Sequence, residues 1–299
     1  MQNVDYKLLS ALNAVITEQS FEKAADKLAI TQSAVSQRIK QLESSYAQPL
    51  LIRSQPIELT PLGEKLLKHF KQVELLEFQL REEISPTERA SSLTVPIAVN
   101  ADTLASWFIP AISPLLKTTD ITLDLHLANE KKTQMLLNKG AVFAAICSKA
   151  RAISGCKSTY LGNLPYVLVS SPDFERRYFP NGLNAETLVN APAVDFDPND
   201  NMHANFIEEH FNVQAGQYPC HRVRSSEAFV FLALEGAAYT LLPITQAKPH
   251  LAAGTLVNLL PKDPVVQKLY WHSWHLEQGI HREVSTRIIN YASELLSEY

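Results

Sequence analysis

Residues 31–43 read TQSAVSQRIKQLE, and this stretch decides how the N-terminal part of the chain folds. Val35, Ile39 and Leu42 recur at spacings of four and three, which predicts a helix with a narrow apolar stripe. Another face of this helix carries small polar groups and one cation, from Ser33, Ser36, Gln37 and Lys40. Such groups can contact phosphates and base edges in a DNA major groove, whereas an ordinary amphipathic surface helix is the alternative.

The residues before this helix indicate a helix-turn-helix. Ser20 is a suitable cap for a short helix whose apolar face consists of Phe21, Ala24, Ala25 and Leu28. Ala29 and Ile30 form a tight turn, and Thr31 caps the next helix. An earlier apolar pattern predicts a covering helix through Leu8, Leu12, Val15 and Ile16. The residues expected to face DNA are Thr31, Gln32, Ser33, Ser36, Gln37 and Lys40.

A short hairpin is predicted directly after the helix-turn-helix. In PLLIRSQPIELT (49–60), two extended runs, 50–52 and 57–59, flank a turn at 54–56. Arg53 lies at the tip of this wing. It is expected to enter a narrow minor groove, where the negative potential favours arginine, and a solvated charge is the alternative.

A long amphipathic helix is predicted to begin at Pro61, because Thr60 is a good cap and proline suits the first helical position. Its apolar stripe consists of Leu62, Leu66, Phe70, Val73, Leu76 and Leu80. A partner helix can bury such a stripe in a short coiled coil, and packing on the chain's own domain is the alternative. We therefore expect a winged helix-turn-helix domain over 1–60, a linker helix over 61–84 and a hinge over 85–92.

From residue 93, short apolar runs alternate with helical patterns. Strands are predicted at 93–99, 121–128 and 141–147, each followed by helical or polar sequence. A second alternating set begins at 164, and the chain ends with a strand and a long helix from about 267. This alternation predicts an α/β domain over 93–299 with a parallel sheet. Its two lobes would comprise about 93–163 plus 267–299, and about 164–266.

Composition limits the classes of protein to which the chain can belong. Its 299 residues are 46% hydrophobic and carry a net charge of −4, which fits a globular protein of two or three domains. Residues 1–60 contain six basic and six acidic residues (four Lys and two Arg, two Asp and four Glu). DNA binding would therefore depend on where the charges lie and on two subunits binding together.

Several other kinds of site are not expected. The three cysteines lack C-x-x-C spacing and no histidine pair has a third ligand nearby, so no metal site is predicted. No G-x-S-x-G, Walker, G-x-G-x-x-G or H-E-x-x-H motif occurs, so we expect no catalytic residues and no cofactor. The chain shows neither a signal peptide nor a run of about 20 apolar residues, so we expect a cytoplasmic protein without membrane contact.

The N-terminal sequence, residues 1–43 followed by PLLIRSQPIELTPLGEKLL (49–67), resembles the winged domain of LysR-type transcriptional regulators. Four later segments extend the resemblance along the chain to the arginine- and lysine-responsive branch of that family. They are VNADTLASWFIPAISPLL (99–116), LVSSPDFERRYFPNG (168–182), FDPNDNMH (196–203) and PCHRVRSSEAFVFLALEG (219–236).

The resemblance implies a sequence-specific DNA-binding regulator of genes for basic amino-acid export or metabolism. Its effector would be L-lysine or L-arginine, held by a two-lobed effector domain similar to periplasmic binding proteins. It further implies a homodimer formed through the linker helix, or a homotetramer, with RNA polymerase as another partner.

Ligands of open parallel sheets bind outside the carboxyl ends of strands, near helix N-termini. Three stretches take such positions: 100–106, 147–148 and 224–227. Backbone N–H groups and hydroxyls there are expected to bind an α-carboxylate, and nearby acids the cationic groups of a basic amino acid. The expected effector contacts are Asn100, Asp102, Thr103, Ser106, Glu130, Ser148, Asp197, Ser225, Ser226 and Glu227. Helix capping by Asp102 and compensation of a helix dipole by Glu227 are the structural alternatives.

Two other functions stay open at this point. A DNA-binding architectural protein would have no small-molecule effector, and a thermal-shift screen against amino acids would distinguish it from a regulator. A solute-binding protein of a transporter is disfavoured by the helix-turn-helix and by the missing signal peptide.

Overall fold

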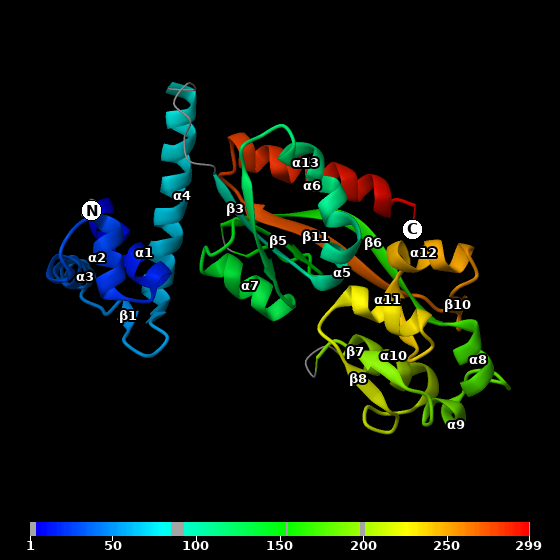
Figure 1. Ribbon diagram of the computed structural model, residues 1–299. Helices are drawn as coiled ribbons and strands as arrows, with labels where there is room; N and C mark the ends of the chain where they lie inside the picture. The colour runs from blue at the N-terminus through cyan, green and yellow to red at the C-terminus, as the bar shows by residue number, and fades with distance from the viewer. Residues whose placement is uncertain (1–3, 85–92, 154, 198–200, 299) are drawn as a thin grey trace.

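The computed structural model describes residues 4–84, 93–153, 155–197 and 201–298 (Figure 1). It comprises a small helical domain, the long helix α4 (Pro61–Ile84) and a larger α/β domain on the other side of α4. The expected hinge over 85–92 lies outside the described residues. The domain and lobe limits given above remain predictions.

The small domain is a winged helix-turn-helix. Its helices are α1 (Tyr6–Glu18), α2 (Phe21–Leu28) and α3 (Gln32–Tyr46). Ser20 accepts a hydrogen bond from the backbone N–H of Lys23, and Thr31 accepts one from that of Ala34, so both predicted caps are confirmed. The wing consists of β1 (Leu51–Ile52) and β2 (Glu58–Leu59), which pair antiparallel. The predicted stripe of α3, Val35, Ile39 and Leu42, is buried in the core of this domain.

Helix α4 contacts the domains on both of its sides. Its first half packs on the helix-turn-helix, where Leu67 and Phe70 are buried. Near its C-terminus, by contrast, Leu80 and Ile84 are 55% and 71% exposed. Packing within one chain therefore accounts for only the first half of the apolar stripe. On the other side, the Glu64 carboxylate forms an ion pair of 3.2 Å with Lys139 of the α/β domain.

The α/β domain is built on a seven-stranded sheet in the order β10-β6-β11-β5-β3-β4, with β9 also paired to β6. Strand β3 is parallel to β4 and β5, whereas β11 is antiparallel to both β5 and β6. The sheet is therefore mixed, and the expectation of a parallel sheet is wrong for β6 and β11. These strands run antiparallel to their neighbours because the chain passes from one lobe to the other along β6 and returns along β11. The strands are β3 (Thr94–Val99), β4 (Thr122–Leu127), β5 (Ala144–Cys147), β6 (Cys156–Ser170), β9 (Thr240–Pro243), β10 (Val257–Asn258) and β11 (Val265–Trp274).

Strands β6 and β11 run between two lobes, and their mutual pairing extends over ten residue pairs. Lobe I contains β3, β4 and β5 with α5 (Ala101–Thr103), a π-helical turn (Leu104–Phe108), α6 (Ile109–Leu116), α7 (Glu130–Asn138) and α13 (Gly279–Leu296). Lobe II contains β7 (Ala193–Asp195), β8 (Cys220–Arg222), α8 (Pro172–Tyr178), α9 (Ala185–Leu188), α10 (Met202–Phe211), α11 (Ser226–Leu234) and α12 (Ile244–Ala252). This is the two-lobed arrangement expected from the sequence.

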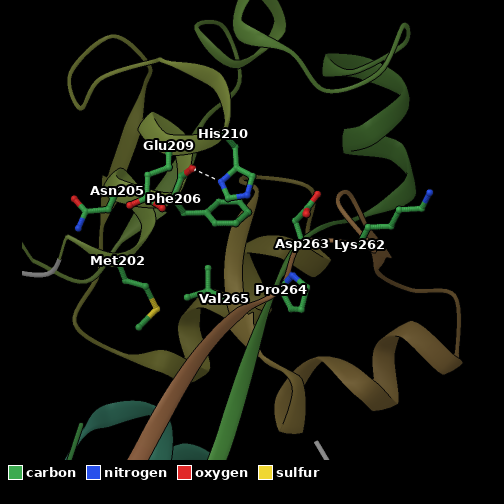
Figure 2. A pocket seen from close by; sticks show the side chains of 9 residues that line it. All are labelled: Met202, Asn205, Phe206, Glu209, His210, Lys262, Asp263, Pro264 and Val265. Carbon is green, nitrogen blue, oxygen red and sulfur yellow. Dashed lines mark hydrogen bonds between the residues drawn. The ribbon is translucent and has the colours of Figure 1, made fainter. Parts of the chain in front are cut away.

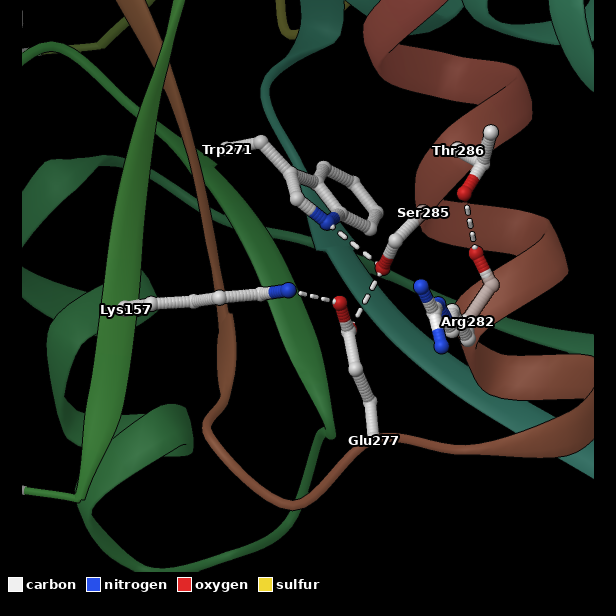
Figure 3. A network of polar contacts seen from close by, with 6 residues as sticks. All are labelled: Lys157, Trp271, Glu277, Arg282, Ser285 and Thr286. Atoms are coloured by element: carbon white, nitrogen blue, oxygen red, sulfur yellow. Dashed lines mark hydrogen bonds and ion pairs between the residues drawn. The ribbon is translucent and has the colours of Figure 1, made fainter.

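A polar network links α13 to β6 and β11, the two strands that run between the lobes (Figure 3). The indole N–H of Trp271 donates to Ser285 Oγ at 2.8 Å, and Ser285 in turn donates to Glu277 Oε2 at 2.7 Å. The other carboxylate oxygen of Glu277 forms an ion pair with Lys157 on β6. Because each polar group in this chain of contacts has a partner, the network holds β6, β11 and α13 as one unit.

Candidate nucleic-acid interface and ligand site

The polar residues predicted to face DNA lie together on the outer surface of α3. Gln32, Ser33, Ser36, Gln37 and Lys40 line one shallow hollow of that surface. All are exposed except Ser36, which is half-buried. Their counterparts on the inner side of α3 are apolar and buried, so the helix presents only hydroxyls, amides and a cation outward.

Thr31 is exposed and occupies the N-terminus of this surface. Its Oγ1 accepts the N–H of Ala34 at 3.2 Å and lies 2.9 Å from the Ser33 hydroxyl. Thr31 thus fixes the start of the helix and orients the hydroxyl of Ser33.

Arg53 lies at the start of the wing tip and is exposed. Its guanidinium carbon is 5.8 Å from the centroid of the Phe21 ring, the first residue of α2. This cation–π contact leaves the guanidinium N–H groups free to approach a phosphate or a base edge. The contact joins the wing tip to the first residue of α2.

A carboxylate joins the two lobes of the α/β domain. Asp102 follows β3 in lobe I, and its Oδ2 accepts a hydrogen bond of 2.7 Å from the hydroxyl of Tyr166 on β6. Its Oδ1 accepts one of 2.6 Å from Ser226, the first residue of α11 in lobe II. No ion pair found among the described residues includes Asp102. Asp102 is thus a half-buried carboxylate whose two oxygens accept hydrogen bonds from hydroxyl groups.

Two glutamines extend this cluster. The Ser226 hydroxyl lies 2.9 Å from Gln246 Oε1, and the Tyr166 hydroxyl lies 3.2 Å from Gln267 Oε1. Tyr166, Gln246 and Gln267 were not predicted from the sequence. The signal available for Tyr166 was a hydroxyl within the apolar run LPYVLV (164–169), because a strand facing only a core would not carry one.

The residues on either side of Asp102 in lobe I have different roles: Asn100 caps a helix, and Thr103 carries a hydroxyl without a partner among the described residues. Asn100 Oδ1 accepts the N–H of Thr103 at 3.3 Å, so Asn100 caps α5 and the idea that Asp102 does so is wrong. Thr103 is fully buried, and its Oγ1 has no hydrogen-bond partner among the described residues. A buried hydroxyl without a partner is costly, and the Thr103 hydroxyl shares this state with other buried groups such as those of Tyr239 and Trp107.

The remaining predicted ligand residues are more dispersed. Ser225 caps α11 and also donates to Glu227 Oε2 at 2.8 Å, so the exposed Glu227 fits the dipole-compensating role. The Ser106 hydroxyl donates to the backbone carbonyl of Asp102. Ser148 after β5 and Asp197 after β7 are half-buried. Glu130 begins α7, but its side chain is not among those that the structure describes. Of the predicted ligand residues, the structure thus joins the side chains of Asp102 and Ser226, with Asn100, Thr103 and Ser106 in the same turn as Asp102.

A cavity of about 490 Å³ lies in lobe II between α10 and the segment before β11 (Figure 2). Met202, Phe206 and Val265 form its apolar wall, and Glu209 and Asp263 bring carboxylates to its lining. Val265 pairs with Tyr166 across β6 and β11, but no residue of the Asp102 cluster lines the cavity itself. No pattern in the sequence indicated it.

Comparison with known proteins agrees with this architecture. Residues 6–64 match the family described as bacterial regulatory helix-turn-helix protein, lysR family, and residues 89–286 match the LysR substrate binding domain. The chain is 50% identical over 290 residues to the HTH-type transcriptional regulator ArgP of Aeromonas salmonicida, covering 97% of each protein. The chain belongs to the LysR family of transcriptional regulators.

Other relatives place this LysR-type regulator in the branch expected from the sequence. The ArgP of Photobacterium profundum is 49% identical over the full length of both chains. The crystal structure of ArgP from Mycobacterium tuberculosis superposes with a TM-score of 0.88 at 30% identity, covering 97% of this chain and 98% of that one. Full-length LysG of Corynebacterium glutamicum with bound effector Arg gives a TM-score of 0.83 at 30% identity, covering 97% and 99%.

The family settles the class of activity. A LysR-type regulator binds DNA and controls transcription, and it is not an enzyme, as the missing catalytic motifs led us to expect. Within the described residues, no helix has both the length and the apolar composition needed to cross a bilayer.

Proposed function

We propose that this LysR-type regulator binds L-lysine or L-arginine between the lobes of its effector domain, and that the bound amino acid alters its binding to DNA. The observation that carries the proposal is Asp102, a half-buried carboxylate that accepts hydrogen bonds from hydroxyl groups of both the crossing strand β6 and lobe II. The arginine bound to the related LysG supports the same class of effector. The controlled genes would serve export or metabolism of basic amino acids, in the cytoplasm where the DNA lies.

Asp102 and its surroundings match the groups of such a ligand. The carboxylate would accept the ammonium or guanidinium of the ligand, because a charge-assisted hydrogen bond is stronger than one from a hydroxyl. The unpartnered Thr103 hydroxyl and the start of α5 would donate to the ligand's α-carboxylate. Ser226 brings lobe II to the same point, so a bound ligand would touch both lobes.

This geometry supplies a mechanism for regulation. The Ser226–Asp102 hydrogen bond holds the lobes together, and a cation at Asp102 would compete with Ser226 for the same oxygen. The ligand can shift the balance between two lobe arrangements only by its difference in affinity for them. A change in lobe angle would alter the distance between the DNA-binding domains of a dimer, whose recognition helices enter major-groove faces about one helical turn apart.

Asp102→Asn is expected to weaken lysine or arginine binding by about tenfold or more, because losing one buried charge-assisted hydrogen bond costs roughly 1.5–3 kcal/mol. Asparagine keeps the size of the side chain and an oxygen acceptor. Isothermal titration calorimetry of the full-length protein with each amino acid measures the change.

Two further variants test where the cationic group of the ligand binds. Asp197→Asn tests another of the expected acidic contacts, and Glu209→Gln tests the cavity of lobe II. If Asp102→Asn and Asp197→Asn both bind the amino acids as tightly as the unaltered protein, the assignment of these acids is wrong. A loss confined to Glu209→Gln would move the cationic end of the ligand into lobe II.

For DNA, Lys40→Ala is expected to weaken binding to every sequence alike and to reduce the slope of log affinity against log salt by about one unit. Lys40 is exposed on the outer surface of α3 and would contact a phosphate. Gln37→Ala should instead weaken specific binding with the salt slope unchanged, because an amide reads a base edge without neutralising charge. Fluorescence anisotropy over a range of salt concentrations separates the two. An unchanged slope in Lys40→Ala would rule out the phosphate contact.

We further propose that two copies pair through α4. Leu80 and Ile84 leave an apolar end of that helix exposed, and a second α4 would bury it. A dimer would also provide the second recognition helix that a nearly neutral DNA-binding domain needs for tight binding.

A further inference from the structure

Gln19 has an unusual conformation for its residue type. It ends α1 with φ 52° and ψ 25°, in the left-handed region. Glycine or asparagine usually occupies such a position, because most other side chains are strained there. Ala29 and Ala47, which follow α2 and α3, adopt the same left-handed conformation, so the role of Gln19 is argued from the contacts of its side chain and not from its backbone.

The Gln19 side chain is hydrogen-bonded to the wing, and we call this pair of contacts with Ile57 the Gln19 clasp. Its Oε1 accepts the backbone N–H of Ile57 at 2.8 Å, and its Nε2 donates to the backbone carbonyl of the same residue at 3.1 Å. Nε2 also donates to the carbonyl of Ile16 on α1 at 2.9 Å, which fixes the orientation of the amide. The amide thus serves both backbone groups of Ile57, as a neighbouring β-strand would.

The base of the wing is held by the buried Leu51 and by Ile57 and Leu59, which pack on the core of the domain, whereas the strand pairing itself is short. Strands β1 and β2 pair through only two residue pairs, Leu51 with Leu59 and Ile52 with Glu58. Ile57 is the next residue toward the tip, so Gln19 supports the wing just beyond the last rung of the ladder. Beyond Ile57, the Ser54 hydroxyl donates a hydrogen bond to the Pro56 carbonyl within the tip itself.

Arg53 lies on the same tip. Its guanidinium rests over the ring of Phe21, which follows Gln19 by two residues and begins α2. Gln19 and Phe21 therefore hold the two sides of the wing tip against the junction of α1 and α2. Helix α2 continues from that junction to the turn before the recognition helix α3.

We propose that Gln19 is a positioning residue for DNA binding, whose amide holds the wing where Arg53 meets the duplex. This inference rests on the proposed contact of Arg53 with DNA. A wing released from Gln19 would have to be ordered anew on each binding event, which weakens binding roughly three- to tenfold for one or two side chains.

The test uses full-length protein with Gln19→Asn, Arg53→Ala and both changes together. Asparagine suits the left-handed conformation and keeps an amide, but it is one methylene shorter and cannot reach both groups of Ile57. Anisotropy with a labelled duplex from upstream of the protein's own gene gives the affinity at several salt concentrations. We expect Gln19→Asn and Arg53→Ala each to weaken binding, and the double variant to bind no more weakly than Arg53→Ala.

The distinctive result is the salt dependence. Gln19→Asn replaces one neutral side chain by another, yet it should lower the salt slope as Arg53→Ala does, because both remove the arginine from the duplex. Thr17→Asn, an exposed change on the same turn of α1, should leave the slope unaltered. Gln19→Gly, which relieves the backbone, should lose affinity like Gln19→Asn without lowering the melting temperature.

A wild-type slope in Gln19→Asn, or fully additive losses in the double variant, would overturn the inference. So would a normal slope in Arg53→Ala. In that last case the proposed wing contact fails as well, while the Lys40→Ala result still reports independently on the recognition helix.

Discussion

Gly63→Ala is expected to destabilise the DNA-binding domain by about 1–2 kcal/mol, although alanine is the better helix former. Gly63 is the third residue of α4, and a Cβ there would lie 2.4 Å from the carbonyl oxygen of Leu50. That oxygen also accepts the N–H of Thr60 at 2.9 Å, so it cannot move away without breaking the start of α4. Helix propensity favours alanine by up to about 1 kcal/mol, whereas forcing a methyl group against packed backbone costs typically 1–3 kcal/mol and occasionally more.

Differential scanning calorimetry of the full-length protein measures this change. We expect the transition of the DNA-binding domain to fall by several degrees, since about 1 kcal/mol shifts the melting temperature of so small a domain by roughly 4–8 °C. The three tryptophans, Trp107, Trp271 and Trp274, all lie in the effector domain, so its fluorescence transition should stay in place. Lys65→Ala, an exposed change on the same helix, is the control. A higher melting temperature in Gly63→Ala would show that propensity outweighs the contact.

The DNA-binding half of the molecule could be predicted from the sequence because its signals are local. Ser20 and Thr31 lie within three residues of the N–H groups that they cap, and the buried stripe of α3 repeats within two turns. The Gln19 clasp was not predicted, since Gln19 and Ile57 are far apart in sequence and neither belongs to a recognised pattern.

In the effector domain, contacts between residues far apart in the sequence could not be predicted. Asp102 was a candidate because it follows a strand, but its partners Tyr166 and Ser226 are 64 and 124 residues away. Strand β6 begins at Cys156, whereas the sequence indicated a strand only from 164. Gly162 and Asn163 interrupt the apolar pattern there, and the register shifts opposite them, between Leu269 and Tyr270 of β11. Pairing with a distant strand, and not local periodicity, determines this part of the fold.

Two buried histidines should make the effector domain sensitive to acid. Burial lowers the pKa of His203 and of His281 to about 4 from the ordinary 6.5, with nearby Glu277 opposing the shift at His281. As the pH falls below 6.5, these two histidines become protonated in the unfolded chain, whereas in the folded protein they stay neutral until about pH 4. The stability that these neutral side chains contribute is therefore complete above pH 6.5 and is lost progressively between 6.5 and 4. At pH 5 the loss is about 2 kcal/mol for each histidine.

His203→Phe is expected to remove about half of that acid sensitivity. Phenylalanine preserves the ring packing on Tyr218 and Tyr239, whose centroids lie 6.0 and 5.3 Å from that of His203, and it cannot take up a proton. Urea unfolding followed by tryptophan fluorescence at pH 7.5 and pH 5 gives the stability difference, which should be about 2 kcal/mol smaller in the variant. The comparison between two pH values cancels any packing change that the substitution introduces. His221→Gln, an exposed change in the same lobe, should behave like the unaltered protein. If His203→Phe loses as much stability on acidification as the unaltered protein does, then His203 is not held neutral by burial, and the acid sensitivity must come from other groups.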